Sequence, residues 1–283
     1  MSLGVLTNVA AINAENSLNQ TQSSLNTVLQ QLSSGSRINS GADDAAGLSI
    51  SDGLGANQAA LTQSAQNAQN GVGLLQTADG ALAQVTNLLD RAVTLATEAA
   101  NGGLTAAQSG AANTEFQSIV TEIGNIGSTT NFNSTNVFTA AATNFVVSDG
   151  TTAGTTTIAA TVGALTSGSV GTATGGGAGQ SLSADVLTSA ASATTALTDV
   201  TTAIADISNQ RGAIGANVNQ LNAASNVASA EQVNLASAQS SILATNFGQA
   251  TSNLAKFQVL NQTGISALAQ ANSTQQEILK LLQ

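Results

Sequence analysis

Side chains that commonly carry out catalysis or bind metals are scarce in this sequence. Its 283 residues include no His and no Cys, which excludes a Ser-His-Asp triad, a Cys nucleophile and a His-ligated zinc site. One acidic pair, Asp43-Asp44, has the residue types of a metal-ligand or acid/base pair. It follows Ser40, however, and a Ser with a carboxylate shortly after it is typical of a helix N-terminus. We therefore predict a capping role for this segment, with Ser40 as the cap, and no enzymatic activity, cofactor or metal site.

The charged residues are few and unclustered. Five Lys and Arg stand against fifteen Asp and Glu, which gives a formal net charge of −10 at pH 7. Binding to nucleic acid or to an anionic membrane surface requires clustered basic residues, so the sequence predicts neither. No stretch approaches the roughly 20 apolar residues needed to cross a bilayer, and we expect no membrane insertion. The excess negative charge favours solubility of the free chain.

Apolar residues that would position any site recur at heptad spacing along the chain. The repeat in the first half consists of Leu18, Leu25 and Leu32, followed by Leu54, Leu61, Ala68, Leu75, Leu82, Leu89 and Ala96. Such a narrow stripe is typical of a long helix that packs on other helices, because the helix cannot bury the stripe alone. Aromatic residues are limited to six Phe, so small aliphatic side chains supply the core, which favours an elongated helical body.

The second half carries a stronger version of the same repeat. It alternates steps of three and four residues from Leu197 to Leu235, and a comparable seam resumes at Phe247. Arg211 interrupts the first of these seams. We expect it to pair with a carboxylate on a neighbouring helix, and the candidates are Glu98, Glu115 and Glu122.

Chain breaks divide the sequence into helical ends and a short polar middle. Ser34-Gly35 and Asn101-Gly102-Gly103 predict helix ends, and a shorter helix is expected over residues 104–126. The middle, residues 129–181, is rich in Gly, Thr, Ser and Asn, and it can hold a few hairpins. Asp149-Gly150 is a hairpin signal, and Gly175-Gly176-Gly177 is interpreted as a flexible connector.

Several segments at the two ends closely resemble the signatures of one family, the bacterial flagellins. The segments are residues 32–50, 65–71, 76–82, 99–102 and 129–133 in the first half, and 211–216 and 264–272 in the second. The two ends match independently and in the right order. The resemblance implies a structural subunit that polymerises into the flagellar filament for swimming motility. The alternatives are a hook–filament junction protein and a filament subunit with an added adhesive or glycan-binding role.

The resemblance also implies a fold and an arrangement of domains. The fold class is mainly α: an elongated antiparallel coiled-coil and helical-bundle subunit with a small β-hairpin region in the middle. The expected parts are an N-terminal inner-tube helix, the N-terminal part of the outer-tube domain, a short variable β-rich tip, the C-terminal part of the outer-tube domain and a C-terminal inner-tube helix. Their boundaries are 1–40, 41–128, 129–181, 182–238 and 239–283.

Partners and interface residues follow from the same resemblance. It implies self-association into a helical homopolymer, type III export to an extracellular flagellum, and contacts with an export chaperone and with cap and hook-junction proteins. We predict that apolar residues of the terminal repeats form the subunit interface: Leu18, Leu25, Leu32, Phe247, Leu254, Phe257, Leu268 and Ile278. Arg91, Leu95 and Glu115 match positions that, in the family, face the Toll-like receptor of a host.

Overall fold

The computed structural model describes residues 7–149, 156–173 and 176–281, without the side chains of 278–281. Within these ranges the chain forms five helices and six short strands. It divides into two compact units. Unit 1 consists of Met1–Ala56 and Asn234–Gln283, and unit 2 consists of Asn57–Val233.

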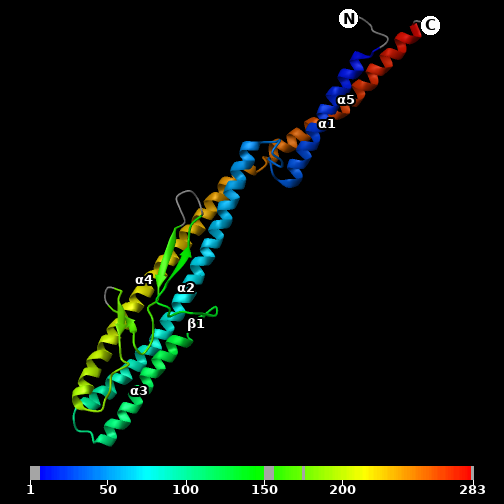
Figure 1. Ribbon diagram of the computed structural model, residues 1–283. Helices are drawn as coiled ribbons and strands as arrows, with labels where there is room; N and C mark the ends of the chain where they lie inside the picture. Colours follow the sequence, from blue (N-terminus) through cyan, green and yellow to red (C-terminus); the bar gives the residue numbers. More distant parts are fainter. Residues whose placement is uncertain (1–6, 150–155, 174–175, 282–283) are drawn as a thin grey trace. The chain divides into compact units, whose positions relative to one another are not determined.

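Unit 1 is built around two helices from the opposite ends of the chain. Helices α1 (Val9–Ser34) and α5 (Phe247–Leu281) lie side by side (Figure 1). The Asn8 side chain donates a hydrogen bond to the carbonyl of Ala271, and Asn261 donates one to Gln22. Because the early residues of α1 meet the late residues of α5, the pair is antiparallel. This confirms the predicted coiled coil of the two chain ends.

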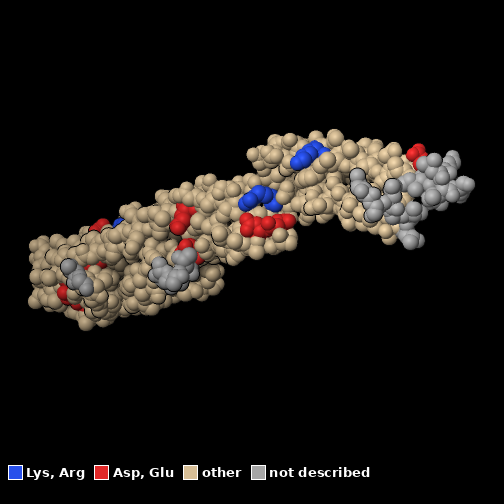
Figure 2. All heavy atoms as spheres, turned by 90° about the horizontal axis from the view of Figure 1, so that it is seen from above, with Lys and Arg blue, Asp and Glu red and all other residues tan. Residues whose placement is uncertain are grey.

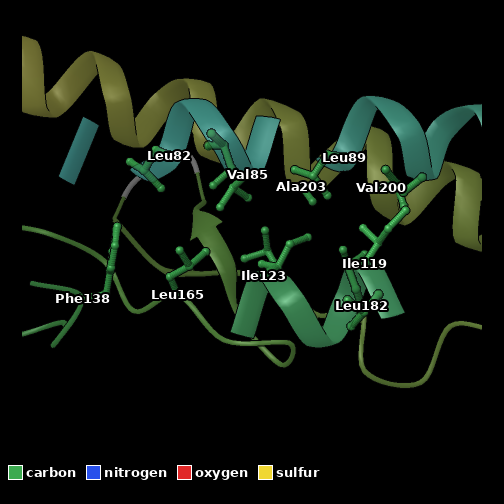
Figure 3. Close-up of a cluster of buried hydrophobic side chains, with 14 of the residues drawn as sticks. Leu82, Val85, Leu89, Ile119, Ile123, Phe138, Leu165, Leu182, Val200 and Ala203 are labelled. Carbon is green, nitrogen blue, oxygen red and sulfur yellow. The ribbon is translucent and has the colours of Figure 1, made fainter. Parts of the chain in front are cut away.

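Helices α2 (Ala45–Ala100), α3 (Ala106–Thr129) and α4 (Ala190–Leu243) supply the rest of the helical structure, and α2 and α4 contribute residues to both units. In unit 2 the heptad residues of α2 become the centre of a core. Leu75, Leu82 and Leu89 are fully buried there, packed among apolar residues of α3 and α4 (Figure 3). The α3 residues in this core include the buried Phe116 and Ile123.

Short polar side chains fix the beginnings of the helices. The residues whose side chains accept a hydrogen bond from a backbone N–H in the first turn are Asn8, Asp44, Thr105, Ser189 and Asn246. The prediction of Ser40 as the cap of α2 was wrong. The helix begins only at Ala45, because the Asp44 carboxylate accepts from the Gly47 N–H at 2.9 Å, whereas the Ser40 hydroxyl donates to Asp43.

Predicted helix ends agree with the structure. Helix α1 stops at Ser34, and Gly35 follows with φ +70°, its N–H donating to the carbonyl of Gln31. Helix α2 stops at Ala100, two residues before Gly102 at φ +67°. A left-handed residue after the last turn satisfies a free carbonyl, and Gly adopts that conformation without the steric cost that a Cβ would add.

The described residues in the middle of the chain form three two-stranded antiparallel sheets. Strand β1 (Asn131–Phe132) pairs with β2 (Thr135–Asn136), β3 (Ala142–Val146) with β4 (Thr157–Thr161), and β5 (Val170–Thr172) with β6 (Ala178–Gln180). The predicted turn residue Gly150 lies outside the described residues, although the β3–β4 pairing around it was expected. Gly176 and Gly177 were interpreted wrongly as a connector. They form the turn of the β5–β6 hairpin, with hydrogen bonds to Ala173.

These hairpins lie along the helices of unit 2 rather than apart from them (Figure 1). Ser64 and Asn67 of α2 donate hydrogen bonds to the carbonyls of Ser148 and Val146 at 2.6 and 3.2 Å. Leu165 in the same region is buried, and its carbonyl lies so close to Gly127 of α3 that any Cβ at that position would overlap it. The middle segment therefore contributes buried side chains, such as Val162, Leu165 and Val170, to the core of unit 2.

Candidate functional site

The predicted interface residues lie mostly in the seam between α1 and α5. Six of them are half-buried there: Leu18, Leu25, Leu32, Leu254, Phe257 and Leu268. Phe247 is largely exposed, and the side chain of Ile278 lies outside the described residues. The structure thus brings six of the eight together within one chain, and Phe247 remains on the surface.

The seam between α1 and α5 is shallow. Among the described residues of these two helices, only Val28 and Ala250 are buried apolar side chains. At one point the helices approach closely, since a Cβ added to Gly264 would lie 3.1 Å from Leu18 Cδ1. Elsewhere the seam contains polar residues such as Asn261. A pair of long helices with so little buried apolar area is weakly held by its own contacts.

Other large apolar side chains of the pair point away from the seam. The exposed ones are Val9, Ile12 and Leu29 on α1, and Val259, Leu260 and Ile265 on α5. Val259, for example, is 66% exposed. The sequence pattern placed Leu29 beside the first stripe, but it missed the other five residues because it followed only the heptad stripe. Large apolar residues at positions outside the heptad stripe could have identified them. Such residues indicate that a second face of the helix is covered by a partner.

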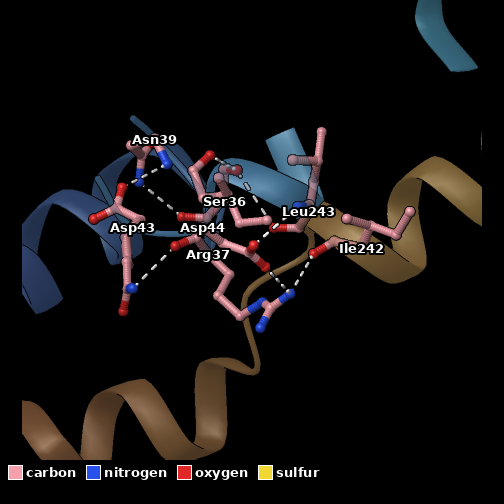
Figure 4. Close-up of polar contacts among 10 residues, drawn as sticks. Ser36, Arg37, Asn39, Asp43, Asp44, Ile242 and Leu243 are labelled. Atoms are coloured by element: carbon pink, nitrogen blue, oxygen red, sulfur yellow. Dashed lines mark hydrogen bonds and ion pairs between the residues drawn. The ribbon is translucent and has the colours of Figure 1, made fainter. Parts of the chain in front are cut away.

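The chain passes from α1 into α2 through a linker that is hydrogen-bonded to the last residues of α4. Arg37 donates from its backbone N–H to the carbonyl of Leu243 at 2.6 Å and from Nη2 to the carbonyl of Ile242 at 3.0 Å (Figure 4). Its guanidinium also lies 3.9 Å from the Asp44 carboxylate. Backbone N–H groups of Asn39 and Ser40 donate to Asp43 and lower the pKa of its carboxyl. The acidic pair therefore braces the linker through Asp43 and caps α2 through Asp44.

The predicted receptor residues lie in unit 2. Arg91 and Glu115 form a bidentate ion pair, with Nε–Oε1 and Nη2–Oε2 distances of 2.7 and 3.0 Å. Both side chains are about half exposed. The hydrogen bonds from Arg91 lower the pKa of the Glu115 carboxyl. Leu95, by contrast, is only 3% exposed and belongs to the core. Of the three residues, only Arg91 and Glu115 are presented on the surface.

Arg211 has a different partner from those predicted. It binds the carboxylate of Asp79 on α2, with the Nε–Oδ1 distance at 2.7 Å, and none of the three glutamates contacts it. Glu115 is already paired with Arg91. The sequence pattern correctly predicted an ion pair with a carboxylate of a neighbouring helix. It could not show which part of α2 lies beside α4.

Charged groups elsewhere are sparse. On the face drawn in Figure 2 they form small separate groups on a surface of mostly uncharged residues. Among the described residues, no cluster of three acidic, His or Cys side chains could hold a metal ion. Within the same ranges, no helix combines the length and apolar character needed to span a bilayer.

Comparison with known protein families gives two matches that cover the helical ends. Residues 5–143 match the bacterial flagellin N-terminal helical region, and residues 197–282 match the bacterial flagellin C-terminal helical region. A flagellin of Listeria innocua is 31% identical over 98% of this chain and 99% of its own length. The two chains are therefore similar from end to end.

Other relatives are longer. The B-type flagellin of Pseudomonas aeruginosa is 44% identical over 132 residues, which are 47% of this chain and only 27% of that protein. Among solved structures, the crystal structure of Bacillus cereus flagellin aligns with a TM-score of 0.46 at 29% identity, covering 57% of this chain and 88% of that one. The sequence matches at both ends carry the assignment: the chain belongs to the bacterial flagellin family, whose members are the structural subunits of the flagellar filament.

Proposed function

We propose that copies of this chain polymerise through α1 and α5 into a flagellar filament that serves swimming motility, and that the chain has no catalytic role. One observation carries the proposal. The helix pair formed by the two chain ends buries little apolar area within itself and exposes Val9, Ile12, Val259, Leu260 and Ile265 to solvent. A helix that is apolar on several sides is stable in water only when neighbours cover it. Other copies of the same helix pair would supply that cover.

The proposed arrangement assigns each part of the chain to a layer. Residues 1–40 and 239–283 would form the inner tube, and residues 41–128 and 182–238 the helical outer tube. Residues 129–181 would form the outermost surface. The extensive core of unit 2 supports this order, because Leu75, Leu82 and Leu89 are fully buried there, whereas the buried apolar side chains among the described residues of α1 and α5 are only Val28 and Ala250.

Seeded elongation tests the proposal. Purified monomer is added to sheared filaments of the same chain, and filament length is followed by electron microscopy. We expect lengthening in proportion to the monomer supplied. A hook–filament junction protein would share the terminal helices but would bind at filament ends without elongating them. Failure to elongate seeds at any monomer concentration would contradict the proposal.

Location and assembly partners belong to the same proposal. We infer that the chain is secreted through the flagellar type III apparatus and resides in the extracellular flagellum. The exposed apolar side chains of α5 would need protection before assembly, which favours binding by an export chaperone. Cap and hook-junction proteins would meet the same helices at the two filament ends. Loss of secretion on deletion of α5, with unit 2 still folded in the cell, is the expected result.

Recognition by a host Toll-like receptor is a proposal for the exposed pair Arg91 and Glu115. Both side chains are about half exposed on neighbouring helices, and Leu95 beneath them keeps those helices packed. A receptor reporter assay with monomeric protein tests this. We expect a response that weakens in Arg91→Gln and Glu115→Gln, while the exposed Gln262→Ala has no effect. Absence of any response at saturating dose would end the idea.

A further inference from the structure

The dipeptide Asn-Gly occurs twice in the chain, and the structure places the two copies in different backbone environments. Asn70-Gly71 lies inside α2, and Asn101-Gly102 directly follows the last residue of the same helix. Both Asn side chains are exposed, and neither side-chain amide forms a hydrogen bond within the described part of the chain. The two sites therefore differ in their backbones and not in the freedom of their side chains.

Asn-Gly pairs are open to a reaction between side chain and backbone. The nitrogen of the Gly can attack the side-chain carbonyl carbon of the Asn and close a five-membered ring. Gly favours this attack because it has no Cβ to hinder the approach. The reaction also requires a change in the Asn ψ angle and a Gly nitrogen that is released from hydrogen bonding. Backbone conformation therefore decides which Asn-Gly pair reacts.

Helix α2 denies both requirements to Asn70. A helical ψ of about −42° and the hydrogen bond from each N–H to the carbonyl four residues earlier hold the Gly71 nitrogen in place. Gly71 is also buried, and a Cβ there would lie 2.9 Å from Leu221 Cδ1. Attack at Asn70 therefore requires local opening of a packed helix, which costs free energy.

The turn after α2 meets both requirements at Asn101. Gly102 is exposed at φ +67°, and its N–H donates no hydrogen bond to any described residue. The Asn101 N–H donates to the carbonyl of Glu98 at 3.4 Å, a long and therefore weak bond. A Cβ added to Gly102 would find its nearest atom, Ala190 Cβ, at 4.0 Å. The space around the reacting atoms is therefore open.

We propose that Asn101 is a site of spontaneous deamidation. The Gly102 nitrogen forms a bond to Cγ of Asn101, the Cγ–Nδ2 bond breaks, and ammonia leaves with the proton that Gly102 gave up. Water then adds to either carbonyl of the succinimide ring, which gives isoaspartate or aspartate. Each event adds a negative charge at the C-terminal end of α2, where the helix dipole disfavours it. The reaction does not depend on polymerisation, because both residues lie in unit 2 of a single chain.

Peptide mapping of the purified monomer tests the proposal. The full chain is incubated at neutral and at mildly alkaline pH, and cleavage after Glu98 and Glu115 releases residues 99–115 for mass spectrometry. We expect Asn101 to convert faster at the higher pH, because the attacking nitrogen must lose its proton. Asn70 should convert at least ~10-fold more slowly, because its helix must open first. Equal rates at the two positions in the folded chain, or an intact Asn101, would overturn the proposal.

Incubation in urea separates the fold from the local sequence. Once α2 is unfolded, the two Asn-Gly pairs should convert at similar rates. A preference for Asn101 that persists undiminished in urea would show that the flanking residues decide the rate, and would overturn the structural argument.

Two variants at exposed positions of the same segment complete the test. Asn101→Gln keeps a side-chain amide but requires a larger ring for the attack, so the acidic species seen on isoelectric focusing should form at least ~10-fold more slowly. Asn70→Gln is the matched control and should leave the rate unchanged. An acidic species that accumulates equally fast in Asn101→Gln would contradict the proposal. If that variant fails to fold, the mapping of the unmodified chain still decides.

Discussion

Units 1 and 2 are made of similar amphipathic helices, yet they hold together very differently. Unit 2 surrounds the α2 heptad residues with α3, α4 and the hairpins, and Leu75, Leu82, Leu89 and Phe116 are fully buried. In the described part of unit 1, the buried apolar side chains are Val28, Ile38 and Ala250. The same heptad repeat therefore makes a stable core where several elements meet and only a shallow seam where two helices meet.

The difference follows from the entropy of ordering a chain. Each ordered residue costs about 1–2 kcal/mol of backbone entropy, and burial of apolar area must offset it. Helices α1 and α5 contain 26 and 35 residues, but few of their side chains leave water in the single chain. We expect unit 2 to fold on its own, and the terminal helices to gain most of their stability from neighbouring copies.

The largest expected effect comes from removing a large side chain in unit 2. Phe116→Ala should lower the free energy of unfolding of the monomer by about 3–5 kcal/mol, because it leaves a cavity in a core where Phe116 is fully buried. Urea unfolding followed by circular dichroism measures this. Phe257→Ala in the half-buried seam of unit 1 is the matched change, with an expected effect on the same transition below ~1 kcal/mol. Equal losses of unfolding free energy in the two variants would contradict the claim that unit 2 is more tightly packed than unit 1.

The next effect concerns assembly, where we expect a change in unit 1 to matter more than one in unit 2. Val259→Gln replaces an exposed apolar residue of α5 with a better helix former, so the monomer should remain unchanged. The critical concentration for polymerisation should rise at least ~10-fold if Val259 is covered by a neighbour. Sedimentation of polymer at graded monomer concentrations measures it. The exposed Gln262→Ala serves as the control, and a normal critical concentration in Val259→Gln would remove this surface from the interface.

A smaller effect involves a carboxyl pair in unit 2. Burial and the neighbouring carboxylate of Asp199 raise the pKa of Asp185 to about 6, and its Oδ2 has no hydrogen-bond partner among the described residues. The folded chain therefore binds more protons than the unfolded chain between pH 3.8 and about 6. Stability contributed by the protonated form is present below this window and is lost as pH rises through it.

Asp185→Asn should remove that pH dependence. We expect the free energy of unfolding at pH 7 to rise by ~1 kcal/mol, a value kept small because solvent screens this partly exposed pair. Urea unfolding between pH 4 and pH 7 gives the comparison with the unmodified chain. Asp199→Asn should act in the same direction but less strongly, because it removes the repulsion and leaves Asp185 buried. An unchanged slope against pH in Asp185→Asn would contradict the raised pKa of Asp185, and an unchanged slope in Asp199→Asn would show that the two carboxyls do not interact.

Salt should have the weakest effect and should act on assembly alone. Each copy carries a net charge of −10, and packing copies side by side brings like charges together. At 0.1 M salt the screening length is about 10 Å, so added salt should lower the critical concentration by a few-fold. Light scattering during polymerisation between low and moderate salt follows the change. Assembly that weakens steadily as salt is added would indicate that attractive ion pairs dominate the contacts.

Most of the helical structure was predicted from the heptad pattern and from the Gly and Asn residues that end helices. Gly35 and Gly102 ended helices as expected, because a positive φ after the last turn suits Gly. The prediction of Ser40 as a cap failed by four residues, since Asp44 offers an equally good acceptor nearer the apolar repeat. A local pattern indicates that a cap is present but does not choose between two candidates within one helical turn or so of each other.

Tertiary features were harder to predict from the sequence. The partner of Arg211 depends on which residues of α2 lie beside α4. The local sequence around Arg211 does not contain that information. The turn at Gly176 and Gly177 resembled a linker because Gly-rich sequence suits both. The exposed residues Val259 and Leu260 were missed because the sequence analysis considered only one apolar stripe on each helix. It assigned no contact to the remaining faces.

Hydrogen exchange tests the contrast between the two units most directly. Amide protection is measured residue by residue in the monomer and in the assembled polymer. We predict that amides of α1 and α5 exchange close to the rate of an unfolded chain in the monomer and become protected in the polymer. Amides around Leu82, Phe116 and Ile123 should be protected in both. Strong protection of α1 and α5 in the isolated monomer, equal to that of unit 2, would contradict this account.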